Sequence, residues 1–65
     1  MNIYSAIQNI AKEKGKSIYR IERDLDFTNG SISKWNKSVP SSISFQKVAD
    51  YLSVSTKDIL DLAKK

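Results

Sequence analysis

The stretch that decides the fold of this chain runs from Ser17 to Lys37 and reads SIYRIERDLDFTNGSISKWNK. Its apolar residues recur at helical spacing in two short runs, Ile18, Ile21 and Leu25, then Ile32 and Trp35. Each run places one apolar stripe on one face of a helix. Residues 26–28 leave room only for a tight turn, so the two helices should cross at a steep angle. The pattern predicts a helix-turn-helix unit over about residues 17–37.

Helical patterns with matching caps account for most of the remaining chain. We expect helices over residues 2–14, from 18 onward, from 28 onward, from 42 or 44 to 52, and from 56 onward. Gly15 suits the left-handed residue after the first helix, and Ser17 is a good N-cap for the second. Thr28 can cap the third, with the poor helix formers Asn29-Gly30-Ser31 as its first turn. Ser55-Thr56-Lys57-Asp58 has the form of a capping box. The predicted fold is all-α, one compact domain of five short helices.

Composition narrows the classes of function. The 65 residues suffice for one domain, 1–65, near the lower limit for folding on an apolar core alone. There is no cysteine and no histidine, so the chain lacks disulfides, the usual zinc ligands and the usual general base. We therefore expect a binding module without metal, cofactor or small-molecule ligand, rather than an enzyme. No apolar run could span a bilayer and no signal-peptide pattern opens the chain, so we expect a cytoplasmic location.

Positive charge is concentrated in the predicted helix-turn-helix and the residues that lead into it. The net charge is +4, and residues 12–37 carry seven lysines and arginines against four acidic residues. Residues 38–65 carry four against three. This distribution favours a polyanionic partner. On charge alone, a basic face that serves only solubility is the alternative.

The chain also resembles a known family. Ser17-Ile-Tyr-Arg-Ile-Glu with Phe27-Thr-Asn-Gly-Ser-Ile-Ser-Lys-Trp is similar to the Cro/C1-type helix-turn-helix domains of phage repressors and xenobiotic-response-element (XRE) regulators. Val48-Ala-Asp-Tyr-Leu-Ser-Val-Ser resembles the family's fourth helix and the turn into its fifth. The likeness extends from about Ile3 to Leu62. It implies a lambda-repressor-like five-helix domain whose third helix enters the major groove of DNA.

Three positions depart from the pattern of that family. The fifth motif position, where the two helices touch and the family commonly has Ala or Gly, is Glu22. The turn position, commonly Gly, is Asp26, which tolerates left-handed geometry. The Gly that often follows the third helix is replaced by Ser38. A carboxylate at position 22 could lie partly exposed and pair with a nearby lysine or arginine.

The side of the third helix opposite Ile32 and Trp35 is predicted to read bases. Its outward positions, which also match the base-reading positions of the family, are Asn29, Gly30, Ser33 and Lys34. Asn29 can bond bidentately to adenine, and Lys34 can donate to guanine O6 and N7. Gly30 would let the backbone approach a thymine methyl group.

Phosphate contacts are expected on both sides of the predicted reading helix. The candidates are Lys16, Ser17, Tyr19 and Arg20 near the start of the second helix, and Lys37, Ser38 and Ser41 beyond the third. These contacts would position the domain without reading sequence. Candidates for a dimer interface are Val54, Ile59 and Leu62, because the last helix carries more apolar residues than a terminal helix needs.

These observations predict a sequence-specific regulator of transcription that binds double-stranded DNA. The leading hypothesis is a phage or mobile-element repressor that binds a near-palindromic operator as a homodimer. The alternative is a protein-interaction module on the same scaffold, such as an antitoxin or adaptor with incidental affinity for DNA. A preference for one sequence that survives competition with random DNA would separate the two.

Overall fold

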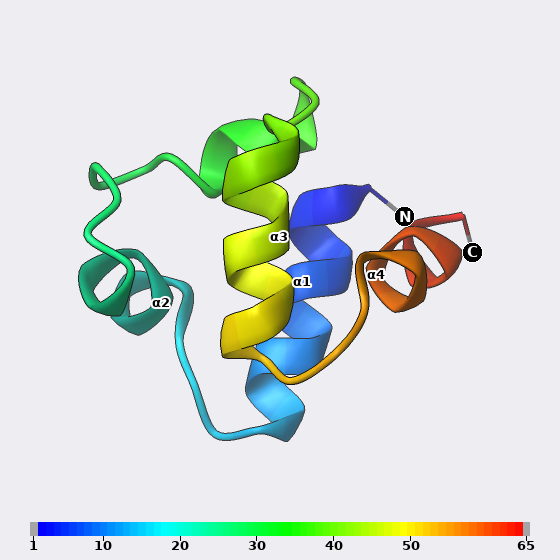
Figure 1. The fold of residues 1–65 in the computed structure, drawn as a ribbon, viewed down its shortest axis with the longest axis horizontal. Coiled ribbons are helices and arrows are strands. Elements are labelled where there is room, and N and C mark those ends of the chain that lie inside the picture. Colours follow the sequence, from blue (N-terminus) through cyan, green and yellow to red (C-terminus); the bar gives the residue numbers. More distant parts are fainter. Residues whose placement is uncertain (1, 65) are drawn as a thin grey trace.

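Four α-helices and one short 3-10 helix form the secondary structure of residues 2–64, the part of the chain that the computed structural model describes. The elements are α1 (Ile3–Glu13), α2 (Ile18–Asp24), η1 (Ser33–Asn36), α3 (Ser42–Tyr51) and α4 (Thr56–Ala63). The helices α1 and α3 run in the same general direction, with α4 on one side of them and α2 on the other (Figure 1). Within this range no helix combines the length and apolar character that crossing a bilayer requires.

A capping side chain begins each of these four α-helices. The oxygens of Asn2, Ser17, Ser41 and Ser55 accept hydrogen bonds from the backbone N–H groups three residues further on. At Ser55 the predicted capping box is complete, because the Asp58 side chain accepts from the Ser55 N–H in return. Gly15 follows α1 with φ 71°, in the left-handed conformation predicted for it. The predicted starts of the first, second, fourth and fifth helices, and the predicted ends of the first and fourth, are therefore confirmed to within a residue or two.

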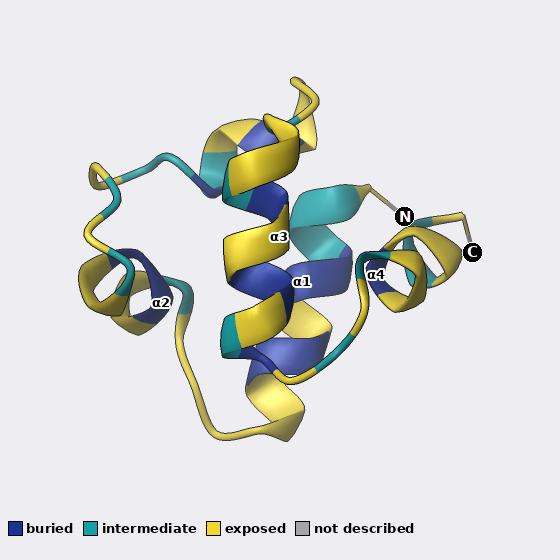
Figure 2. Cartoon of the chain, in the orientation of Figure 1, coloured by how far each residue is buried: buried dark blue, intermediate teal, exposed yellow. Residues whose placement is uncertain are grey.

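The core is formed by one apolar face of each helix, as the alternation of buried and exposed residues along the ribbons in Figure 2 shows. Its buried members are Ala6, Ile7, Ile10, Ala11, Ile21, Ile32, Trp35, Phe45, Val48, Ala49, Leu52 and Ile59. The helix α1 packs against both α4 and η1, and α3 packs against α4. The start of α1 and the end of α4 consequently lie beside each other, away from α2 (Figure 1).

The prediction of an α-helix beginning at Thr28 is wrong, and residues 2–64 contain four α-helices rather than five. Residues 29–32 form turns, followed by the single 3-10 helix η1, whose N-cap position is Ile32. Gly30 has φ 86°, which interrupts a helix at the point where its first turn was expected. In addition, the hydroxyl of Ser31 donates to the Thr28 carbonyl, and that of Ser33 to the Gly30 carbonyl. Such local bonds compete with the hydrogen bonds of a regular helix, so the only helical part of this stretch is the short 3-10 helix η1.

Candidate nucleic-acid interface

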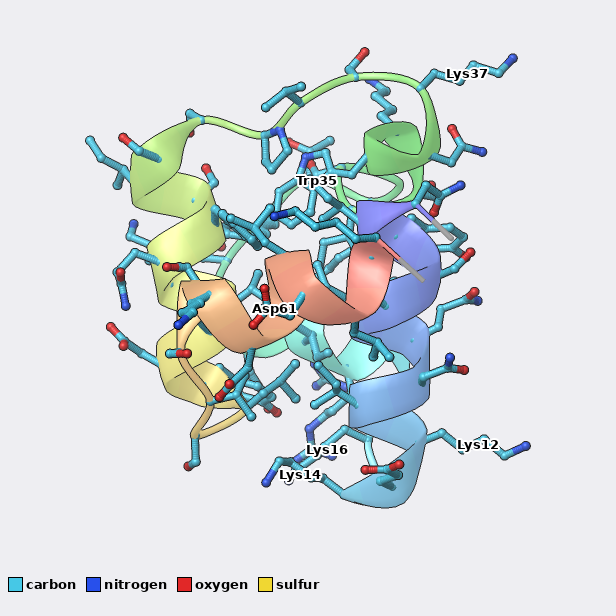
Figure 3. All side chains as sticks on the ribbon, turned by 90° about the vertical axis from the view of Figure 1, so that its right-hand side faces the viewer. Lys12, Lys14, Lys16, Trp35, Lys37 and Asp61 are labelled. Carbon is cyan, nitrogen blue, oxygen red and sulfur yellow. The ribbon has the colours of Figure 1, made fainter. Side chains whose placement is uncertain are left out.

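The segment from Asn29 to Lys37, here called the 29–37 segment, is anchored on one side. Ile32 is fully buried and Trp35 nearly so, and η1 packs on α1. The Trp35 ring meets the Phe27 ring edge-on, with centroids 6.5 Å apart. Figure 3 shows Trp35 directed into the interior beneath the ribbon. The prediction that these two apolar side chains support the segment from behind is confirmed.

The opposite side of the 29–37 segment is small, polar and accessible. The side chains of Asn29 and Lys34 are exposed, and Gly30 and Ser33 are half-buried. The Ser33 hydroxyl already donates to the Gly30 carbonyl at 2.9 Å. All four residues predicted to read bases therefore lie where a large ligand could reach them, although on turns and a 3-10 helix rather than on an α-helix.

Behind this segment, the carboxylate of Glu22 joins it to α2. Glu22 is 4% exposed, so it does not form the exposed pair with lysine or arginine considered from the sequence. Instead, its Oε2 accepts a hydrogen bond from the Ile32 N–H at 2.9 Å. Its Oε1 accepts one from the Gly30 N–H at 3.2 Å. The burial of the carboxylate is compensated by backbone donors rather than by a cation.

A groove of about 390 Å³ lies beside the start of α2. Its lining residues are Gly15, Lys16, Ser17, Tyr19, Arg20 and Arg23. The structure thus brings together the four phosphate-contacting candidates predicted for this end of the molecule. Lys16 is placed by a contact with α3, since its Nζ lies 5.8 Å from the centre of the Tyr51 ring. Three cations line this groove, and even with Asp24 paired to Arg20 positive charge is in excess there, which suits an anion.

One ion pair restrains the Arg20 side chain in this groove. Its Nε donates to Asp24 Oδ2 at 3.0 Å, and the Tyr51 hydroxyl donates to the same oxygen. The hydrogen bonds from Tyr51 and then Arg20 lower the pKa of the Asp24 carboxyl below its ordinary value of 3.8. The same bond to Asp24 raises the pKa of Tyr51. This cluster links α2 to the last turn of α3.

A second groove, of about 330 Å³, lies along the 29–37 segment and is lined by Ser33, Lys34, Asn36, Lys37 and Ser38. It shares no residue with the groove at α2, and Figure 3 shows Lys37 and Lys16 at opposite ends of the molecule. This groove is therefore lined by two candidates for base reading, Ser33 and Lys34, and by two for phosphate contact, Lys37 and Ser38. Ser41 is exposed beyond this groove, but its hydroxyl accepts from the Ser44 N–H as the cap of α3.

Arg23 is a further cation at the groove beside α2, and it was not among the site residues predicted from the sequence. It is exposed and lines the groove at α2 beside Arg20. Residues three apart on a helix share a face, so the spacing from Arg20 to Arg23 was a signal that could have identified it.

The dimer-interface candidates need a correction at one residue. Ile59 is 0% exposed, so its side chain is used within the chain and cannot form part of a surface between two copies. Val54 and Leu62 are half-buried and pack against the same core. The large apolar side chain that α4 does expose is Leu60, which is 41% accessible.

Comparisons of this chain with protein-family models, with curated proteins and with solved structures find no match.

Proposed function

We propose that this chain is a sequence-specific DNA-binding regulator of the Cro/C1 helix-turn-helix type. In this proposal, the exposed side of the 29–37 segment meets base edges in the major groove, with Asn29 and Lys34 as the principal reading residues. The cations around the two grooves, Lys16, Arg20 and Arg23 on one side and Lys37 on the other, contact phosphates. The chain acts as a cytoplasmic repressor on a near-palindromic operator.

The observation that carries this proposal is the two-sidedness of the 29–37 segment. Ile32 and Trp35 fasten one side to the core, while Asn29 and Lys34 are exposed and Lys34 lines one of the two grooves that carry cations. Base readout needs polar groups held rigidly at an accessible surface, and phosphate contacts on both flanks hold the protein in register on the duplex. The excess of lysine and arginine over residues 12–37 supplies the charge for this role.

Binding as a homodimer follows from the small size of the reading surface. One such segment covers only a few base pairs, and a second copy on the next half-site would supply the missing affinity. Half-sites one helical turn apart are separated by roughly 34 Å. The longest extent of the chain is 28 Å, so two copies side by side are of the right size.

Selection of bound duplexes from a random pool tests the proposal. The expected result is a defined sequence repeated with two-fold symmetry at a spacing of about 10 base pairs. Affinity for that sequence should fall linearly with salt on a log–log scale and survive competition with random DNA. A pool that stays random after several rounds would refute the function.

Two exposed apolar residues favour a second candidate, a protein-interaction module such as an antitoxin or adaptor. Val39 is 86% exposed and Ile43 is 70% exposed, close together in the chain where the loop after η1 enters α3. Exposed apolar side chains near each other are more typical of contacts with protein than with phosphate. For such a module, substituting both by serine would abolish partner binding, while for the DNA reader it would leave the selected sequence unchanged.

A further inference from the structure

The buried carboxylate of Glu22 makes none of the contacts assigned to DNA above, because both of its oxygens accept from backbone N–H groups. It lies on α2, and both of its hydrogen bonds reach the 29–37 segment, eight and ten residues further along the chain. The two donors, the N–H groups of Gly30 and Ile32, lie between Asn29 and Ser33, within the stretch proposed to read bases. A single side chain therefore joins the helix beside the phosphate groove to the backbone of the reading surface.

The two hydrogen bonds to Glu22 restrain the backbone at Gly30 and Ile32 more tightly than a single bond would. A carboxylate is planar and its two oxygens have a fixed separation, so two amides bound to them have a defined position and a defined orientation. Gly30 needs such a restraint, because its φ of 86° lies in a region that glycine enters and leaves easily. Packing of η1 on α1 fixes the far end of the segment, but Ile32 is the first of its buried anchors. Glu22 holds the part that precedes this anchor.

We propose that Glu22 is a positioning residue, which holds the backbone at Gly30 and Ile32 and so sets the register between the reading side chains and the phosphate contacts of α2. The specificity part of this inference rests on the proposed function. Sequence discrimination depends on the bidentate tie, whereas non-specific attraction to DNA does not, because the cations remain in place. The same tie also occupies two N–H groups, so the phosphate contacts come from the side chains around the grooves.

The test compares Glu22→Gln with Ile21→Val, a neighbouring substitution in α2. Glutamine keeps the shape but has one acceptor oxygen, and its NH₂ group would face the second N–H. Ile21 is fully buried and has an apolar side chain, so Ile21→Val controls for a general loss of stability. Two quantities are measured in each variant. One is the hydrogen exchange of the Gly30 and Ile32 amides relative to the core amide of Val48, and the other is the affinity for the selected duplex relative to random duplex.

For Glu22→Gln we expect exchange of at least one of the two amides to accelerate about tenfold relative to Val48. Affinity for the selected duplex should fall about tenfold, while affinity for random duplex changes by no more than about twofold. Ile21→Val should leave both ratios unchanged. The inference would be overturned if the wild type and Glu22→Gln gave the same exchange and affinity ratios. It would also be overturned if Glu22→Gln lost affinity equally for selected and random DNA.

A measurement on the unchanged chain covers the case in which Glu22→Gln does not fold. Scalar couplings across the hydrogen bonds, from the Gly30 and Ile32 nitrogens to the side-chain carboxyl carbon of Glu22, should be detectable, and their absence would overturn the inference. A wild-type chain without sequence preference would refute the proposed function and the specificity role together. Because the exchange and coupling data involve no DNA, they would still establish or overturn the tie itself.

Discussion

Replacing Gly30 by alanine distinguishes the observed turn from a regular third α-helix by the sign of the stability change. In the interior of an exposed α-helix, Gly→Ala stabilises by about 1 kcal/mol. In the structure, Gly30 has φ 86°, and among residues 2–64 its new Cβ would meet only Ser33 Oγ, at 3.7 Å, an ordinary van der Waals distance. The cost is therefore backbone strain, about 1–2 kcal/mol for an alanine held in left-handed geometry. For a domain of this size, each kcal/mol lowers the Tm by roughly 4–8 °C.

Gly15→Ala is the matched control for this experiment. Gly15 has φ 71°, and no atom of the described residues lies within 4 Å of its added Cβ. The Gly15→Ala protein should therefore be destabilised by a similar amount. Both variants are compared with the wild type by thermal and urea unfolding. If Gly15→Ala is destabilised but Gly30→Ala is at least as stable as the wild type, Gly30 does not have a positive φ. That result would favour a regular third α-helix instead.

Three further predictions concern the DNA contacts, α4 and the ion cluster. Lys34→Ala should change the base preferred at one position of each half-site. Lys37→Ala should instead weaken binding to all duplexes alike and reduce the slope of log affinity against log salt by about 0.9. Identical behaviour of the two variants would contradict the assigned reading face. Ile59→Ala should lower the free energy of unfolding by about 2–5 kcal/mol because Ile59 is fully buried. Leu60→Ala should lower it by no more than about 0.5 kcal/mol. Equal losses for the two variants in urea denaturation would contradict the burial of Ile59. Because the pKa of Asp24 is lowered, its pairing stabilises the fold at pH values above the ordinary pKa of 3.8. This stability is lost as the pH falls through the pKa of the folded state. Tyr51→Phe removes the largest cause of this shift, so acid titration should cost that variant less stability than the wild type; an unchanged acid loss would contradict the pairing.

The four α-helices could be predicted from sequence because their boundaries are set locally. Ser17 and Ser55 cap backbone N–H groups three residues away, and Gly15 adopts its left-handed conformation directly after α1. Each of these signals lies within one turn of the boundary that it sets, so spacing and residue type suffice. The apolar stripes predicted which residues face the core for the same reason.

The third element could not be predicted because part of what holds it is a side chain from another helix, in addition to the local bonds of Ser31 and Ser33. The conformation of Gly30 accompanies hydrogen bonds to Glu22, and the sequence shows neither that Glu22 is buried nor which donors it meets. The family pattern marked position 22 as unusual but carried no information on its partners. Likewise, Ile59 and Leu60 are adjacent apolar residues in a short helix, and only the packing of α4 against α1 and α3 shows which of them is buried.

Intermolecular nuclear Overhauser effects between the labelled protein and its selected duplex test the central claim most directly. The exposed side of the 29–37 segment is predicted to lie in the major groove, so the side chains of Asn29 and Lys34 should show contacts to base protons there. Contacts to DNA that arise from α4, with none from Asn29 or Lys34, would contradict the account.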